Sequence, residues 1–175
     1  MSGAVNRSGH RSRWAALLDL IQPEDNLSAV IYGELIAGAT IAAAIGETSS
    51  VLELAAVTVG TLAVYWVAHA YADFVGDYMA AGGRGHTSVW HTLLRELPMV
   101  TACLPPLVVL VLARGLDASP DTACYAALAY VTISLMGYGF RSARRAGLAW
   151  PMQIGATLLH AVLGAAIILL KVVLH

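Results

Sequence analysis

The sequence predicts an all-α protein that crosses a membrane several times. Of its 175 residues, 58% are hydrophobic and only 12% are charged, which is about half the charged fraction of an ordinary soluble domain. Long apolar runs recur with few interruptions, a pattern typical of polytopic helical membrane proteins. The length leaves room for one membrane domain and for no separate soluble domain.

We expect five transmembrane helices inside a single membrane domain that covers residues 26–175. Their approximate ranges are 26–46, 51–80, 98–115, 121–140 and 150–174. Each span is near or above the roughly 20 residues that cross the hydrocarbon core, except the third. That span is short and contains Pro105 and Pro106, which interrupt its backbone hydrogen bonds, so we expect a hinge or a cavity wall there.

Residues 1–25 are expected to form a cytoplasmic N-terminal segment. Apolar residues at helical spacing between Trp14 and Ile21 predict an amphipathic helix on the membrane surface, which Pro23 ends. The basic start of the chain lacks the apolar core and small-residue cleavage site of a signal peptide, so we expect no cleavable signal. The residues able to cap the first span are Glu24, Asp25 and Asn26.

The distribution of basic residues predicts the orientation of the chain. With the N-terminus in the cytoplasm, eight of the ten Lys and Arg residues lie inside, and only Arg114 and Lys171 lie outside. Basic residues concentrate on the cytoplasmic side of membrane proteins. We therefore expect a multi-pass protein of the cell (inner) membrane, with its N-terminus inside and its C-terminus outside.

Ionisable side chains share one face of the second span. In the stretch VYWVAHAYADFVGDYMA, residues 64–80, His69, Asp73 and Asp77 follow one another at intervals of four, and Tyr65 extends the face by one turn. A rise of about 1.5 Å per residue places His69 about one turn inside the membrane and Asp77 in the cytoplasm. We interpret this face as a polar surface that leads from the cytoplasm into the inner leaflet, and we call it the cytoplasmic ramp.

Glu34 is an acidic residue within the first span, about 12 Å from its cytoplasmic start. An unpaired charge in lipid costs at least ~2.5–3.5 kcal/mol, so this carboxyl needs a partner or a watery cavity. We expect Glu34 and His69 to converge from neighbouring spans. Carboxylates with an imidazole suit Fe²⁺ or Mn²⁺, or a proton relay, and the expected metal ligands are Glu34, His69 and Asp73.

Each of these residues also has a structural interpretation. His69 can donate one hydrogen bond to a neighbouring helix, and Glu34 can be a protonated carboxyl bonded to a backbone carbonyl. Asp73 and Asp77 can be solvated at a helix end. His160, near the midplane of the fifth span, is either a transport residue or a packing residue.

The connection between the second and third spans offers a weaker site. His86 and His91 lie five residues apart, and with Glu96 they predict a cytoplasmic metal-capture patch on or beside a short interfacial helix over residues 88–97. Their spacing fits no standard zinc site. A solvated loop is the alternative.

Small residues predict close helix packing. Gly38, Ala42 and Gly46 repeat every four residues in the first span, and a similar face in the fifth span includes Ala161 and Ala165. Such faces let helices approach one another closely. They indicate either packing within the monomer or the interface of a homodimer.

These features predict a membrane cation transporter or channel and no enzyme, with Fe²⁺ or Mn²⁺ as cargo and with proton coupling. Metal binding would displace protons, so transport should weaken as the pH falls. The alternative is a non-catalytic membrane scaffold or accessory subunit; a lipid-modifying enzyme that uses Asp73 and Asp77 is less favoured. The net charge of −1 gives no indication of a nucleic-acid partner.

The sequence also resembles the vacuolar iron transporter family (VIT/CCC1-like). IYGELIAGATIAAAIG is similar to the family's first span, and TACLPPL has a proline where the family's third span has one. LMGYGFRSARRAGLAWPMQIGATLLHAVLGAAI is similar to its fourth span, basic loop and fifth span. The resemblance implies a homodimer that exchanges Fe²⁺ or Mn²⁺ for protons, with Glu34 at the intramembrane acidic position. The family's glutamate-rich domain is replaced by a short link that holds Glu96.

Overall fold

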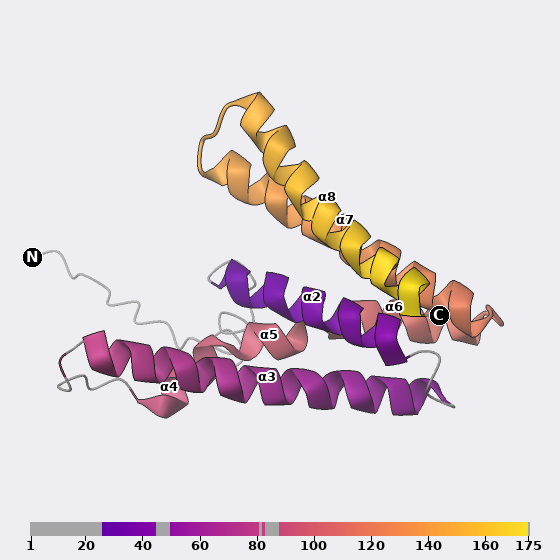
Figure 1. Cartoon of the computed structure of the whole chain (residues 1–175), viewed down its shortest axis with the longest axis horizontal. Helices are drawn as coiled ribbons and strands as arrows, with labels where there is room; N and C mark the ends of the chain where they lie inside the picture. Colours follow the sequence, from indigo (N-terminus) through magenta and orange to yellow (C-terminus); the bar gives the residue numbers. More distant parts are fainter. Residues whose placement is uncertain (1–25, 45–49, 81, 83–87, 175) are drawn as a thin grey trace, which may run out of the picture.

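The computed structural model describes residues 26–44, 50–80, 82 and 88–174, and these residues are almost entirely helical (Figure 1). The helices are α2 (Leu27–Ala44), α3 (Val51–Ala80), α4 (Val89–Arg95), α5 (Leu97–Thr101), α6 (Leu104–Gly115), α7 (Pro120–Arg145) and α8 (Trp150–Leu174). Five described segments are long and apolar enough to cross a membrane, with α4, α5 and α6 together forming the third. The predicted all-α, five-span architecture is therefore confirmed. The surface helix expected within residues 1–25 lies outside the described residues.

Polar side chains at the helix starts explain where three of the spans begin. Asn26 caps α2, because its Oδ1 accepts hydrogen bonds from the backbone N–H of Ala29 and from the Ser28 hydroxyl. Ser50 Oγ accepts from the backbone N–H of Glu53 at the start of α3. Ser119 caps α7 in the same way. Each side chain satisfies a backbone donor that has no partner inside its helix.

The helical hydrogen bonding of the third span is interrupted twice. At Glu96, between α4 and α5, the backbone leaves helical geometry. At Ala102 and Cys103, just before Pro105 and Pro106 in the first turn of α6, the dihedral angles stay helical and only the hydrogen-bond pattern of the helix is interrupted. Proline is tolerated in a first helical turn, where no backbone donor is lost. The second break therefore follows from the predicted effect of the two prolines, and the first places the Glu96 side chain beside α3.

Helix α2 is the central element of the bundle, since it packs against α3, α5, α7 and α8. Helices α7 and α8 form an antiparallel hairpin that is inclined to α2 and α3 (Figure 1). Large fully buried side chains fill the space between the helices: Ile41, Leu54, Leu62, Leu110, Leu128 and Leu135. The outer faces of α3 and α8 expose apolar side chains such as Val64 and Leu158, as expected of surfaces that contact lipid.

Glycines set the closest helix contacts. A Cβ atom at Gly33 would lie 2.1 Å from the backbone oxygen of Met99 on α5, so only a glycine lets the two backbones approach this closely. A Cβ atom at Gly38 would lie 3.3 Å from Ile167 Cδ1 on α8. The small-residue face of the first span thus packs within the monomer at Gly38, whereas Gly46 lies outside the described residues.

Candidate metal centre

The cytoplasmic ramp predicted on α3 meets the break between α4 and α5. One ligand atom from each of His69, Asp73 and Glu96 lies within 4.8 Å of the other two. His69 Nε2 is 3.8 Å from Glu96 Oε2. His69 and Asp73 were predicted as metal ligands and Glu96 as part of a separate capture patch, and the fold brings the three side chains close together.

Burial differs across this cluster, which we name the His69 cluster and define as His69, Asp73 and Glu96. The Glu96 side chain is only 4% exposed, whereas those of His69 and Asp73 are 37% and 36% exposed. Glu96 therefore forms the buried floor of the cluster, and the other two side chains leave it open to the surroundings.

Arg95 supplies the positive charge beside the cluster. Its Nη2 donates a hydrogen bond to Asp73 Oδ2 at 2.9 Å, and its Nε donates to Glu96 Oε1 at 3.1 Å. Asp77 Oδ2 lies 3.9 Å from Arg95 Nη1. Three carboxylates thus share one guanidinium, which leaves an excess of negative charge that attracts cations. Glu96 uses one oxygen for Arg95 and presents the other toward His69.

Side chains from α3 and from the start of α2 hold the end of α4 and the His69 ring in place. Trp66 Nε1 donates to the Leu93 carbonyl at 2.9 Å, and Asn26 Nδ2 donates to the Arg95 carbonyl at 3.1 Å. The Tyr32 ring of α2 lies 5.9 Å from the His69 ring, centroid to centroid. These contacts fix both the helix break that carries Glu96 and the imidazole that faces it.

The donor set of the His69 cluster fits a divalent first-row cation. One imidazole nitrogen and two carboxylate groups are the ligand types used for Fe²⁺ and Mn²⁺, whereas a thiolate site would favour softer ions. Neighbouring ligand atoms about 2.0–2.2 Å from a shared ion lie roughly 3–3.6 Å apart in octahedral or tetrahedral geometry. The ligand atoms of the cluster lie within 4.8 Å of one another, so binding an ion requires them to draw together by up to about 1–2 Å, through rotation of the half-exposed His69 and Asp73 side chains.

No protein-family model, curated protein or solved structure matches the chain. The resemblance to the vacuolar iron transporters therefore stays a prediction from the sequence.

Glu34 lies apart from the His69 cluster and contacts α7. It is 1% exposed, and its Oε1 accepts a hydrogen bond from Ser134 Oγ of α7 at 2.7 Å. No hydrogen bond or ion pair joins Glu34 to His69 among the described residues. Residues two apart on a helix point about 200° apart, so Tyr32 faces α3 while Glu34 faces α7. Within the part of the chain that the structure describes, Glu34 Oε2 has no hydrogen-bond partner and is thus available to a proton or a cation.

Removing the Ser134 hydroxyl should destabilise the bundle through Glu34. We expect Ser134→Ala to cost about 1–3 kcal/mol, because a buried carboxyl loses its hydrogen-bond partner. Thermal unfolding in detergent measures this loss. Ser142→Ala on the same helix is the matched control, since the Ser142 hydroxyl donates to the Gly139 carbonyl three residues back in that helix. Equal melting temperatures for the two variants would contradict a structural role for the Glu34–Ser134 pair.

The remaining predicted residues lie apart from the His69 cluster. His160 Nδ1 donates to the Ala156 carbonyl at 2.8 Å and packs against Gly139, contacts that fit its packing interpretation. His91 is exposed on α4, and His86 lies outside the described residues. Tyr65 lines a groove between α2 and α3. Arg95 was not among the predicted site residues, although it lies beside Glu96 and four residues after His91.

Proposed function

We propose that the protein is an integral membrane transporter or channel for a divalent first-row cation such as Mn²⁺ or Fe²⁺. The observation that supports this best is the convergence of His69, Asp73 and Glu96 at one end of the α3 span. In the orientation that the basic residues predict, this end is cytoplasmic. The His69 cluster would then be the site at which the ion exchanges water for protein ligands.

The charge and burial of the cluster support exchange of an ion rather than permanent storage. Arg95 competes with a cation for Asp73 and Glu96, which limits the affinity of the site. Conduction needs a site that binds well enough to admit an ion and weakly enough to release it. Glu34, a buried carboxyl with one oxygen that has no partner among the described residues, is the proposed proton carrier deeper in the membrane.

A membrane scaffold or accessory subunit is the second candidate, favoured by the same arginine. Because Arg95 already pairs with Asp73 and Glu96, the cluster can also be a structural network that ties α4 to α3. Such a network needs no metal. A scaffold would bind no divalent ion and would catalyse no flux.

Ion flux into liposomes separates the two candidates. Purified protein is reconstituted around a dye that Mn²⁺ quenches, and we expect uptake that falls about tenfold or more in Glu96→Gln, which removes a ligand without changing the size of the side chain. Asp117→Asn is the control: Asp117 lies in the α6–α7 connection with φ 61°, a conformation that asparagine also adopts. Absence of flux in the unmodified protein would contradict transport.

A further inference from the structure

A second feature of α3 is a row of side chains that repeats every fourth residue along the helix. We call it the polar row; six of its seven positions are polar or ionisable, and Val57 is the exception. The members are Glu53, Val57, Thr61, Tyr65, His69, Asp73 and Asp77. Four residues exceed one turn by about 40°, so the row winds around α3 as it runs along the membrane. Its second half reaches the His69 cluster.

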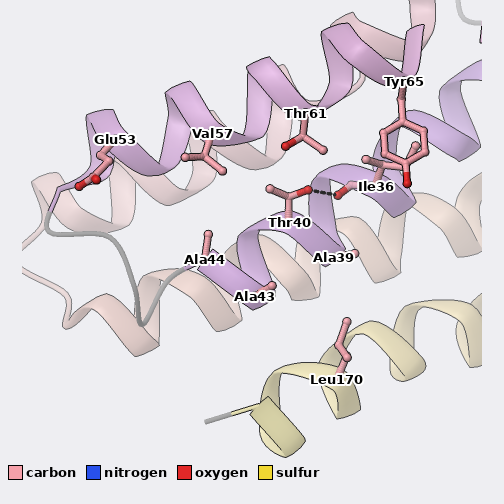
Figure 2. A pocket seen from close by; sticks show the side chains of 10 residues that line it. All are labelled: Ile36, Ala39, Thr40, Ala43, Ala44, Glu53, Val57, Thr61, Tyr65 and Leu170. Carbon is pink, nitrogen blue, oxygen red and sulfur yellow. Dashed lines mark hydrogen bonds between the residues drawn. The ribbon is translucent and has the colours of Figure 1, made fainter. Parts of the chain in front are cut away.

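The first half of the polar row lines a groove. This groove has a volume of about 690 Å³ and lies between α2 and α3, with Leu170 of α8 at its border (Figure 2). Its walls on the α2 side are small or apolar, apart from Thr40, whose hydroxyl donates to the Ile36 carbonyl. Figure 2 shows Thr61 and Tyr65 projecting from α3 toward α2.

Two hydroxyl groups in this groove have no protein partner. Among the described residues, neither the Thr61 nor the Tyr65 hydroxyl forms a hydrogen bond, although both lie on a membrane-spanning segment. A hydroxyl moved from water into an apolar medium without a partner costs about 1–3 kcal/mol by protein mutational data. With these side-chain conformations, lipid acyl chains in the groove would leave both groups unsatisfied, whereas water or a hydrated ion would satisfy them.

The groove ends close to the candidate metal centre along α3. Tyr65 is one helical turn, about 6 Å, from His69 along α3. Glu53 lies at the opposite end of the groove, near the first turn of α3. An ion leaving the His69 cluster would therefore meet Tyr65 and Thr61 next, and a carboxylate at the far end.

From these contacts we propose that the groove is the water-filled outer half of the ion route, through which a hydrated divalent cation passes between the His69 cluster and the other side of the membrane. The inference rests on the proposed transport function. It adds the path of the ion and assigns Thr61 and Tyr65 as groups that line it. A groove filled by lipid is the competing arrangement.

Cysteine accessibility tests whether the groove holds water, independently of transport. Thr61→Cys in liposomes should react with a permanently charged thiol reagent about tenfold or more faster than Val64→Cys, because hydrocarbon excludes the charged reagent. Val64 is a matched control, since it is 70% exposed on the apolar face of the same helix. The native Cys103 and Cys124 are buried, which keeps the background low. Equal, slow reaction at both positions would overturn the inference.

A bulky substitution tests whether the ion uses the groove. We expect Thr61→Trp to lower Mn²⁺ flux about tenfold or more by filling the route, with unchanged Mn²⁺ affinity at the His69 cluster. Val64→Trp should leave both quantities unchanged. Normal flux in Thr61→Trp would overturn the groove as the route, whereas failure of Mn²⁺ to bind the unmodified protein would overturn the proposed function itself.

Discussion

His69→Ala is expected to weaken Mn²⁺ binding by on the order of 100-fold or more, because a directly coordinating nitrogen contributes at least as much as the outer partners of a metal site. The loss should be large at this position because His69 supplies the single nitrogen donor of the cluster. Titration calorimetry on purified protein in detergent measures the affinity.

His91→Ala provides the matched control for that experiment. His91 lies on α4, is exposed, and is not part of the His69 cluster, so its removal should leave the affinity unchanged. The comparison also separates the two sites that the sequence suggests, one on the second span and one on the inner connection. A larger loss in His91→Ala than in His69→Ala would mean that the ion binds on the connection and not on α3.

Gly33→Ala is expected to destabilise the helix bundle strongly. The added methyl group would lie 2.1 Å from the Met99 backbone oxygen and 2.9 Å from Ala102 Cβ. A backbone atom cannot rotate away as a side chain can, so α2 and α5 must separate. Overpacking of this kind costs about 1–3 kcal/mol, and more where the backbone is the obstacle.

The control for Gly33→Ala is Gly60→Ala on α3, where an added Cβ meets no atom within 4 Å. Alanine favours the helix by about 0.5–1 kcal/mol relative to glycine, so this variant should melt at the same temperature or higher. Because α5 follows Glu96 directly, Gly33→Ala should also weaken Mn²⁺ binding. A stable Gly33→Ala variant would show that α2 and α5 pack differently from the arrangement described here.

The order and extent of the spans could be predicted because the residues that determine them lie close together in the sequence. Helix α3 covers the expected residues 51–80. The third span is interrupted just before Pro105 and Pro106, the two prolines at which the sequence predicts a hinge or a cavity wall. Asn26, one of three capping candidates, begins α2. Each span is defined by the length and apolar content of one run of residues and by the caps and prolines at or near its ends. These features can be read from a single sequence without knowledge of the fold.

The partners of the site residues could not be predicted, because they depend on how each helix is rotated. Helices α2 and α3 are apolar on most of their surface, so hydrophobic periodicity does not reveal which face is buried. Glu34 was expected to meet His69, yet its hydrogen-bond partner is Ser134, 100 residues away. The contact between His69 and Glu96 depends on the break between α4 and α5, where no residue other than Pro98 gave a sequence signal.

The proposed metal centre also explains a feature that was visible in the sequence. A helix that crosses a membrane does not need ionisable residues every four positions. In the structure the last three members of the polar row meet Arg95 and Glu96, so each acquires a partner from the neighbouring element. The regular spacing of these side chains on α3 is therefore matched by the break between α4 and α5, which places Arg95 and Glu96 next to them.

Electron spin echo spectroscopy of the Mn²⁺-loaded protein is the most direct test of the central proposal, that His69, Asp73 and Glu96 hold a divalent cation. The method detects nitrogen nuclei bound to Mn²⁺. We predict a ¹⁴N modulation from one coordinated imidazole in the unmodified protein, and its loss in His69→Gln with His91 intact. A spectrum from the unmodified protein that contains only water protons around Mn²⁺ would contradict the account.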